Sequence, residues 1–148
     1  MKKILLPALF SAIAFTAFAP LSFAQTAAPA AAKAPAFKAH VLNRAEVDAL
    51  FQHPENVLVI DVRRPDELTS KGGFPVYLSV QNDQVEQSLK WIPKGRTLLV
   101  VSNHAARAGK VADLLKDRGF KVAGAAGVQL YEQEGGTLLK VAPPAPKS

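Results

Sequence analysis

The chain has 148 residues, 49% of them hydrophobic, and a formal net charge of +6 at pH 7. This length suits a single small domain with one core. The mild basic excess lacks the clustered basic stripe with interleaved aromatic residues that is expected of a nucleic-acid-binding protein. The chain has no cysteine, which excludes disulfides and any thiol-based redox role.

Residues 1–24 predict a Sec-type signal peptide. Two lysines precede an uncharged run of 21 residues, Ile4 to Ala24, which ends in the small-x-small sequence SFA. We therefore expect cleavage after Ala24 and a periplasmic or secreted protein that begins at Gln25. The alternative is an uncleaved anchor, since a run of this length is just long enough to span a bilayer. Only in that case do we expect attachment to a membrane.

The composition divides the remaining chain into three parts. Residues 25–36 are rich in alanine and proline and predict an extended linker, because they offer too few large apolar side chains to pack. Residues 142–148 predict a similar flexible tail. The folded domain is therefore expected over residues 37–141.

The first predicted elements are a helix and a buried strand. Asn43 and Glu46 have the spacing of a helix N-cap with its reciprocal glutamate, which predicts a short helix that ends near Gln52. Residues 57–60 are a continuous β-branched and apolar run. Such a run is typical of a strand buried on both faces of a mainly parallel sheet, and Asp61 is expected to end it.

Strands and helices alternate along the rest of the domain. We expect the first turn of a helix at 65–67, a short strand at 76–80, a helix at 83–89, a buried strand at 97–101, a helix from 105 to 118, a strand near 121–123 and a helix at 128–133. Gly119 and Phe120 are placed to end the longest helix in a Schellman motif, with Phe120 against Leu115. This order predicts a three-layer α/β fold with a mainly parallel sheet flanked by helices.

The loop from Ser102 to Arg107 is the main candidate site. Its six residues, Ser102, Asn103, His104, Ala105, Ala106 and Arg107, join the second buried strand to the longest helix. Backbone N–H groups in such a loop can surround an anion. Arg107 and Lys110 oppose the helix macrodipole, which an anion at the helix start would offset. The alternative is that both side chains reach solvent or pair with an aspartate or glutamate on the preceding turns.

Two further groups of residues have predicted roles. Asp61 is expected to accept N–H bonds from its loop, and Arg63 to brace that loop as its partner. His40 and His53 lie at the linker edge and in a turn, without cysteines or a spaced carboxylate cluster beside them. We therefore expect no metal site and no cofactor.

Several motifs together resemble the rhodanese-like sulfurtransferase family. They are the strand and acidic turn LVIDVRRPDE at 58–67, the turn Gly73-Phe74-Pro75, the segment WIPK at 91–94, the loop SNHAAR at 102–107 and the partial signature AGVQLY at 126–131. The family's turn reads Gly-His-Ile-Pro-Gly-Ala, and its active-site loop has cysteine at the position of Ser102. It also tends to have glycine near Ala105 and Ala106. The resemblance implies a rhodanese-like fold over nearly the whole domain.

The serine changes the expected chemistry. In active members of the family, the cysteine thiolate takes a sulfane sulfur from a donor such as thiosulfate, holds it as a persulfide and passes it to a thiol or cyanide. A serine hydroxyl cannot hold sulfur in this way, and its pKa is far above the roughly 8.5 of cysteine. A nucleophilic Ser102 would need a base, for which His104 is the local candidate.

Three functions follow from the sequence. The preferred one is an exported, catalytically inactive rhodanese-like module that binds an unknown periplasmic protein or a small oxyanion through the loop from Ser102 to Arg107. The second is a sulfurtransferase- or phosphatase-like enzyme that uses Ser102. The third is a tethered structural or adaptor domain, whose working part is the arm at 25–36.

Overall fold

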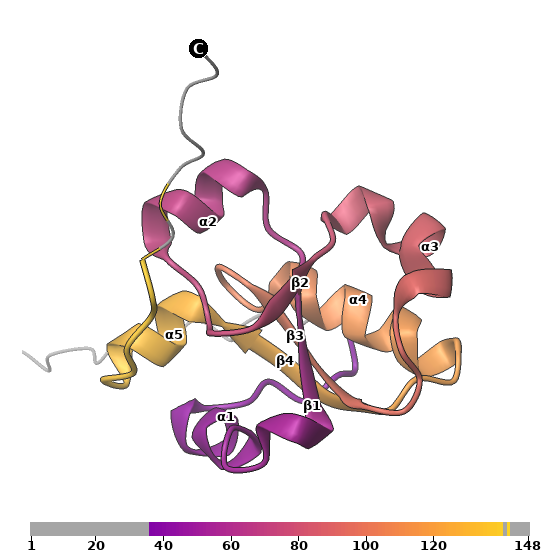
Figure 1. The fold of residues 1–148 in the computed structure, drawn as a ribbon, viewed down its shortest axis with the longest axis horizontal. Coiled ribbons are helices and arrows are strands. Elements are labelled where there is room, and N and C mark those ends of the chain that lie inside the picture. The colour runs from indigo at the N-terminus through magenta and orange to yellow at the C-terminus, as the bar shows by residue number, and fades with distance from the viewer. Residues whose placement is uncertain (1–35, 141, 143–148) are drawn as a thin grey trace, which may run out of the picture. The chain divides into compact units, whose positions relative to one another are not determined.

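The computed structural model of the chain describes residues 36–140 and residue 142. The predicted signal peptide, most of the predicted linker and the tail from residue 143 lie outside the described residues. In the described part, helices lie on both sides of a central sheet (Figure 1). The three-layer α/β fold with a mainly parallel sheet is therefore confirmed.

The sheet has four parallel strands in the order β2-β1-β3-β4. These strands are β1 (Val57–Asp61), β2 (Tyr77–Ser79), β3 (Thr97–Ser102) and β4 (Val122–Gly127). The continuous apolar runs form the two central strands, β1 and β3, as their composition predicts. Because all four strands run the same way, the loops that follow them meet at one edge of the sheet.

The helices are short, apart from the one that follows β3. They are α1 (Arg44–Leu50), α2 (Pro65–Lys71), α3 (Val85–Ser88), α4 (Ala106–Asp117) and α5 (Val128–Gln133), with 3-10 turns η1 (Pro54–Asn56), η2 (Asn82–Gln84) and η3 (Leu89–Trp91). None of the helices in residues 36–140 is long and apolar enough to cross a membrane.

Both predicted helix caps are confirmed. The Glu46 backbone N–H donates to Asn43 Oδ1 at 3.0 Å, and the Asn43 N–H donates to Glu46 Oε2 at 2.9 Å. At the end of α4, the Phe120 N–H donates to the Leu115 carbonyl at 3.0 Å, and Gly119 has φ +79°. These contacts satisfy backbone groups that the helix ends leave unpaired.

Two hydrophobic cores lie on opposite faces of the sheet. One contains Ala108, Val111 and Leu115 of α4, together with Val85 of α3. The other contains side chains of α1, α5 and the loop after α2, among which Phe74 packs edge-on against Tyr131 with ring centroids 4.9 Å apart. Burial on both faces holds the loops after the strands in fixed relative positions.

The observed elements differ from the expected ones at three places. The helix expected at 83–89 is divided among η2, α3 and η3, since Asn82 and Asp83 favour turns over helix interiors. The strand expected at 76–80 begins only at Tyr77, because Val76 has φ 54° and cannot continue a strand. The last strand is β4 at 122–127, longer than the predicted strand near 121–123.

The length of β4 depends on small residues that a strand pattern does not reveal. A Cβ at Gly124 would lie 2.5 Å from the His40 carbonyl oxygen. The chain at 40–42 can therefore approach β4, where the Ala125 N–H donates to the His40 carbonyl and the Leu42 N–H to the Ala125 carbonyl, both at 2.8 Å. Tertiary contact thus overrides the low strand propensity of glycine and alanine.

Candidate functional site

Ser102 is the last residue of β3, and its side chain is enclosed. The residue is 1% exposed, and its Oγ accepts the backbone N–H of Ala108 at 3.1 Å. Ala108 lies in the first turn of α4, where backbone N–H groups have no partner within the helix. The hydroxyl of Ser102, at the end of β3, therefore provides an acceptor for a backbone N–H in the first turn of α4.

The turn between Ser102 and α4 contains a strained residue. Ala105 has φ 59° and ψ −23°, the left-handed region, although it has a Cβ. The loop packs closely on β4, since a Cβ at Gly127 would lie 3.0 Å from the Ala105 nitrogen. A left-handed backbone costs a residue other than glycine about 1 to 2 kcal/mol. The loop therefore keeps a shape that glycine would adopt without strain.

Arg107 contacts a carboxylate from another helix. Its Nη1 and Nη2 donate to Glu67 Oε2 and Oε1 of α2 at 2.9 and 2.5 Å. The hydrogen bond from Arg107 lowers the pKa of Glu67 to about 2. The positive charge at the start of α4 is thus offset by Glu67, rather than by solvent or by an acidic residue of a preceding turn.

Asn103 links this ion pair to a second one. Its Nδ2 donates to Glu67 Oε1 at 2.8 Å, and its Oδ1 accepts from Arg63 Nη1 at 3.4 Å. Arg63 is itself buried and donates to both carboxylate oxygens of Asp61, with the shortest distance 2.7 Å. It also donates to the Gly72 carbonyl at 2.8 Å. Polar groups at the ends of β1 and β3 therefore form one connected network.

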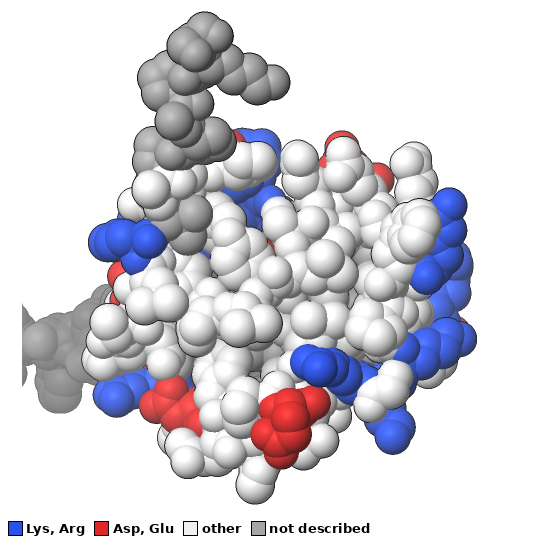
Figure 2. Space-filling view, viewed as in Figure 1, with Lys and Arg blue, Asp and Glu red and all other residues white. Residues whose placement is uncertain are grey.

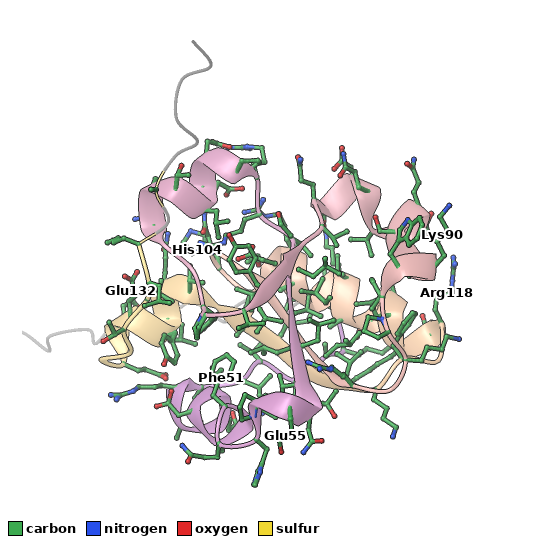
Figure 3. The ribbon with its side chains drawn as sticks, in the orientation of Figure 1. Phe51, Glu55, Lys90, His104, Arg118 and Glu132 are labelled. Carbon is green, nitrogen blue, oxygen red and sulfur yellow. The ribbon has the colours of Figure 1, made fainter. Side chains whose placement is uncertain are left out.

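His104 and Ser102 differ in exposure and are not hydrogen-bonded to each other in the described part of the chain. His104 is exposed, whereas Ser102 is buried. Figure 3 labels His104 in the region between α2 and α5. In the described part of the chain, the Ser102 hydroxyl thus serves as an acceptor for α4, and His104 does not contact it as a base would.

A cavity of about 580 Å³ lies beside the loop. The loop contributes residues 103–106 to its wall, and residues from the start of the domain and from α5 complete it. These include Phe37, Val41, Gln129, Leu130 and Gln133, with Lys110 of α4 at the side. Apolar groups with a few amides and one cation are suited to a side chain or a short peptide segment.

Among residues 36–140 and 142, no group of three or more histidine and acidic side chains gathers to hold a metal ion. His40 Nε2 lies 2.7 Å from Glu46 Oε1, and His53 Nδ1 lies 3.6 Å from Glu55 Oε1. Each of these two histidines therefore pairs with a single nearby carboxylate.

Solved structures show what this arrangement is similar to. A rhodanese-related protein from Thermoplasma volcanium matches with TM-score 0.60 and 20% identity, over 69% of this chain and 99% of that one. A rhodanese-like domain protein from Staphylococcus aureus matches with TM-score 0.57 and 20% identity, over 67% and 97% of the two chains. The domain has the rhodanese-like fold.

Another similar structure is a protein of unknown function from Rhodopseudomonas palustris that is described as a possible tyrosine phosphatase. It has TM-score 0.58 and 20% identity, over 68% of this chain and 85% of that one. No model of a known protein family matches this chain, and no curated protein matches it.

Within the rhodanese-like fold, sequence reasoning missed two parts of the site. Glu67 belongs to the motif at 58–67 but had no predicted role in the loop. Its signal is its place in the first turn of α2, where its Oε2 also accepts the Arg64 N–H at 3.0 Å. The cavity was also missed, because Phe37 and Leu130 are far apart in sequence and become neighbours only in the fold.

Proposed function

We propose that this protein is an exported rhodanese-like module without sulfurtransferase activity, which binds a partner protein through the loop at 102–107 and the adjacent cavity. The observation that supports this proposal most strongly is the state of Ser102. Its hydroxyl is buried and accepts the Ala108 N–H, and the chain contains no thiol. Sulfur transfer through a persulfide therefore has no atom on which to proceed.

A partner protein fits the site better than a small oxyanion. An external oxyanion at Arg107 must compete with the Glu67 carboxylate, which makes two hydrogen bonds to the same guanidinium. The cavity beside the loop has apolar walls and remains open to an incoming side chain. Lys110 at its side favours a segment that carries an acidic residue next to an apolar one.

Two matched variants test this binding. Leu130 is 37% exposed and lines the cavity, whereas Leu139 is 56% exposed and does not line it. A periplasmic protein that the unmodified chain retains should be lost with Leu130→Glu and kept with Leu139→Glu. Equal loss with both variants, or with neither, would contradict binding at the cavity.

The enzyme alternative has a separate test. The phosphatase description of the similar Rhodopseudomonas palustris protein suggests an aryl phosphate as the probe. We expect no hydrolysis by the purified protein. Hydrolysis that Ser102→Ala abolishes would show that Ser102 is a nucleophile after all.

The export and adaptor aspects concern residues outside the described part. Mass spectrometry of protein isolated from cells should find an N-terminus at Gln25, and an intact Met1 would indicate an anchor instead. Deletion of residues 25–36 should preserve binding at the cavity. If binding is lost with the deletion and kept with Leu130→Glu, the arm is the working part, and the module is the tethered adaptor.

A further inference from the structure

A basic surface lies at the end of the sheet opposite the loop. We call it the Trp91 face, and it consists of Lys90, Trp91, Lys94, Arg118 and Lys121, all exposed. Figure 2 shows basic side chains gathered at the right of the view, and Figure 3 places Lys90 and Arg118 at that edge, away from His104.

Contacts between two chain segments hold this face together. Lys94 Nζ lies 5.4 Å from the centroid of the Phe120 ring, which joins the segment before β3 to the segment before β4. The Lys121 carbonyl accepts the Leu98 N–H at 2.7 Å. The segments that carry Lys94 and Lys121 are therefore held beside each other at the amino ends of β3 and β4.

Trp91 is the apolar centre of the face. It is the only tryptophan of the chain, and it is 73% exposed. Lys90 Nζ lies 5.0 Å from its ring centroid. An exposed aromatic ring contributes little burial to the stability of the fold. An amphipathic ring with lysines around it is typical of side chains at a membrane interface.

Acidic side chains offset little of this charge. Glu86 pairs with Arg118 at 3.2 Å. Asp117, which directly precedes Arg118, is also exposed. The stretch 87–96, which leads into β3, contains Lys90, Lys94 and Arg96 and no aspartate or glutamate. The face therefore presents a net positive charge around an apolar centre.

We propose that the Trp91 face binds the anionic headgroup surface of a lipid bilayer. Its lysines attract the surface charge, and the ring of Trp91 enters the headgroup layer. A bilayer fits better than an acidic protein segment because the aromatic ring projects outward, whereas a bound segment would need a groove such as the one beside the loop.

This contact would set the orientation of the domain. The strands are parallel, and β3 runs from Thr97, next to the Trp91 face, to Ser102 at the loop. Six residues of strand span about 20 Å. A domain bound through the Trp91 face would therefore hold its loop and cavity away from the bilayer and open to a partner. The proposal does not depend on what the cavity binds.

The emission of Trp91 provides a direct test, because no other tryptophan contributes. The exported protein, which we expect to begin at Gln25, is mixed with vesicles of phosphatidylcholine alone, or of equal parts phosphatidylcholine and phosphatidylglycerol. We expect the emission to shift to shorter wavelength, and nitroxide-labelled lipid to quench it, only with phosphatidylglycerol. Added salt should weaken the effect, since it screens exposed charges.

Two triple variants with the same charge change provide the control. One is Lys90→Gln with Lys94→Gln and Lys121→Gln, and the other is Lys38→Gln with Lys71→Gln and Lys140→Gln, all at exposed positions. Each basic side chain near an anionic surface strengthens binding about fivefold, so the first triple variant should need about a hundredfold more lipid to reach half-maximal quenching of Trp91. The second should behave like the unmodified chain.

Two results would overturn the proposal. One is equal quenching of Trp91 in both triple variants, which would mean that other parts of the chain bring it to the lipid. The other is an emission shift with polyglutamate but not with phosphatidylglycerol vesicles, which would identify the face as a site for an acidic polypeptide.

Discussion

Two residues with a Cβ adopt backbone shapes that suit glycine, one of them in the loop of the candidate site and the other in the turn before β2. Ala105 has φ 59° in the loop, and Val76 has φ 54° directly after Pro75. The turn at Val76 adopts this shape although the residue is β-branched. The surrounding structure, rather than the local sequence, therefore determines these two conformations.

Val76→Gly should stabilise the domain. Val76 is 81% exposed, so its side chain loses little burial when removed. Relief of the left-handed strain should outweigh the added entropy of the unfolded chain and raise the free energy of unfolding by about 1 kcal/mol. Urea denaturation measures this difference. Val76→Ala keeps a Cβ and should gain less, and an equal gain for both variants would place the cost in the side chain instead of the backbone.

Ser102→Ala should destabilise the domain. The variant leaves the Ala108 N–H without its acceptor in a buried place, which costs about 1 to 2 kcal/mol. Urea denaturation again provides the measurement. An unchanged unfolding midpoint would show that the hydroxyl of Ser102 does not cap α4.

At the scale of elements, α2 and α4 are joined by the ion pair between Glu67 and Arg107. The side chain of Glu67 is 15% exposed and that of Arg107 is 36% exposed. Solvent screens part of their attraction, so we expect Glu67→Gln to lower the free energy of unfolding at neutral pH by about 1 to 2 kcal/mol.

The pH dependence of this pair has a definite sign. The folded pKa of Glu67 is about 2, below its ordinary value of 4.5. A carboxyl with a lowered pKa contributes stability that is present above about pH 4.5 and is lost as the pH falls toward 2. Between pH 4.5 and 2, the free energy of unfolding should therefore fall more steeply with decreasing pH for the unmodified chain than for Glu67→Gln. Parallel curves would contradict the role of the ion pair.

The sequence predicts elements best where one local pattern decides them. The runs at 57–60 and 97–101 form the central strands, and the helix caps at Asn43 and Gly119 form as their spacing indicates. The length of β4 and the partner of Arg107 depend on segments distant in sequence. For example, Glu67 lies 40 residues before Arg107, and no local pattern encodes that distance.

At the scale of the whole molecule, the fold separates two surfaces. The loop and the cavity lie at the carboxyl ends of the strands, where ligands bind in open α/β sheets. The Trp91 face lies at the opposite ends. Under the two proposals above, the protein would hold a partner on one side while the other side contacts a charged surface, and neither role requires chemistry at Ser102.

The most direct measurement is a thiosulfate:cyanide sulfurtransferase assay on the purified protein, in parallel with Ser102→Ala. We expect thiocyanate formation no greater than in buffer for both proteins, because a buried hydroxyl that accepts the Ala108 N–H cannot carry sulfane sulfur. Turnover by the unmodified protein that disappears in Ser102→Ala would contradict it.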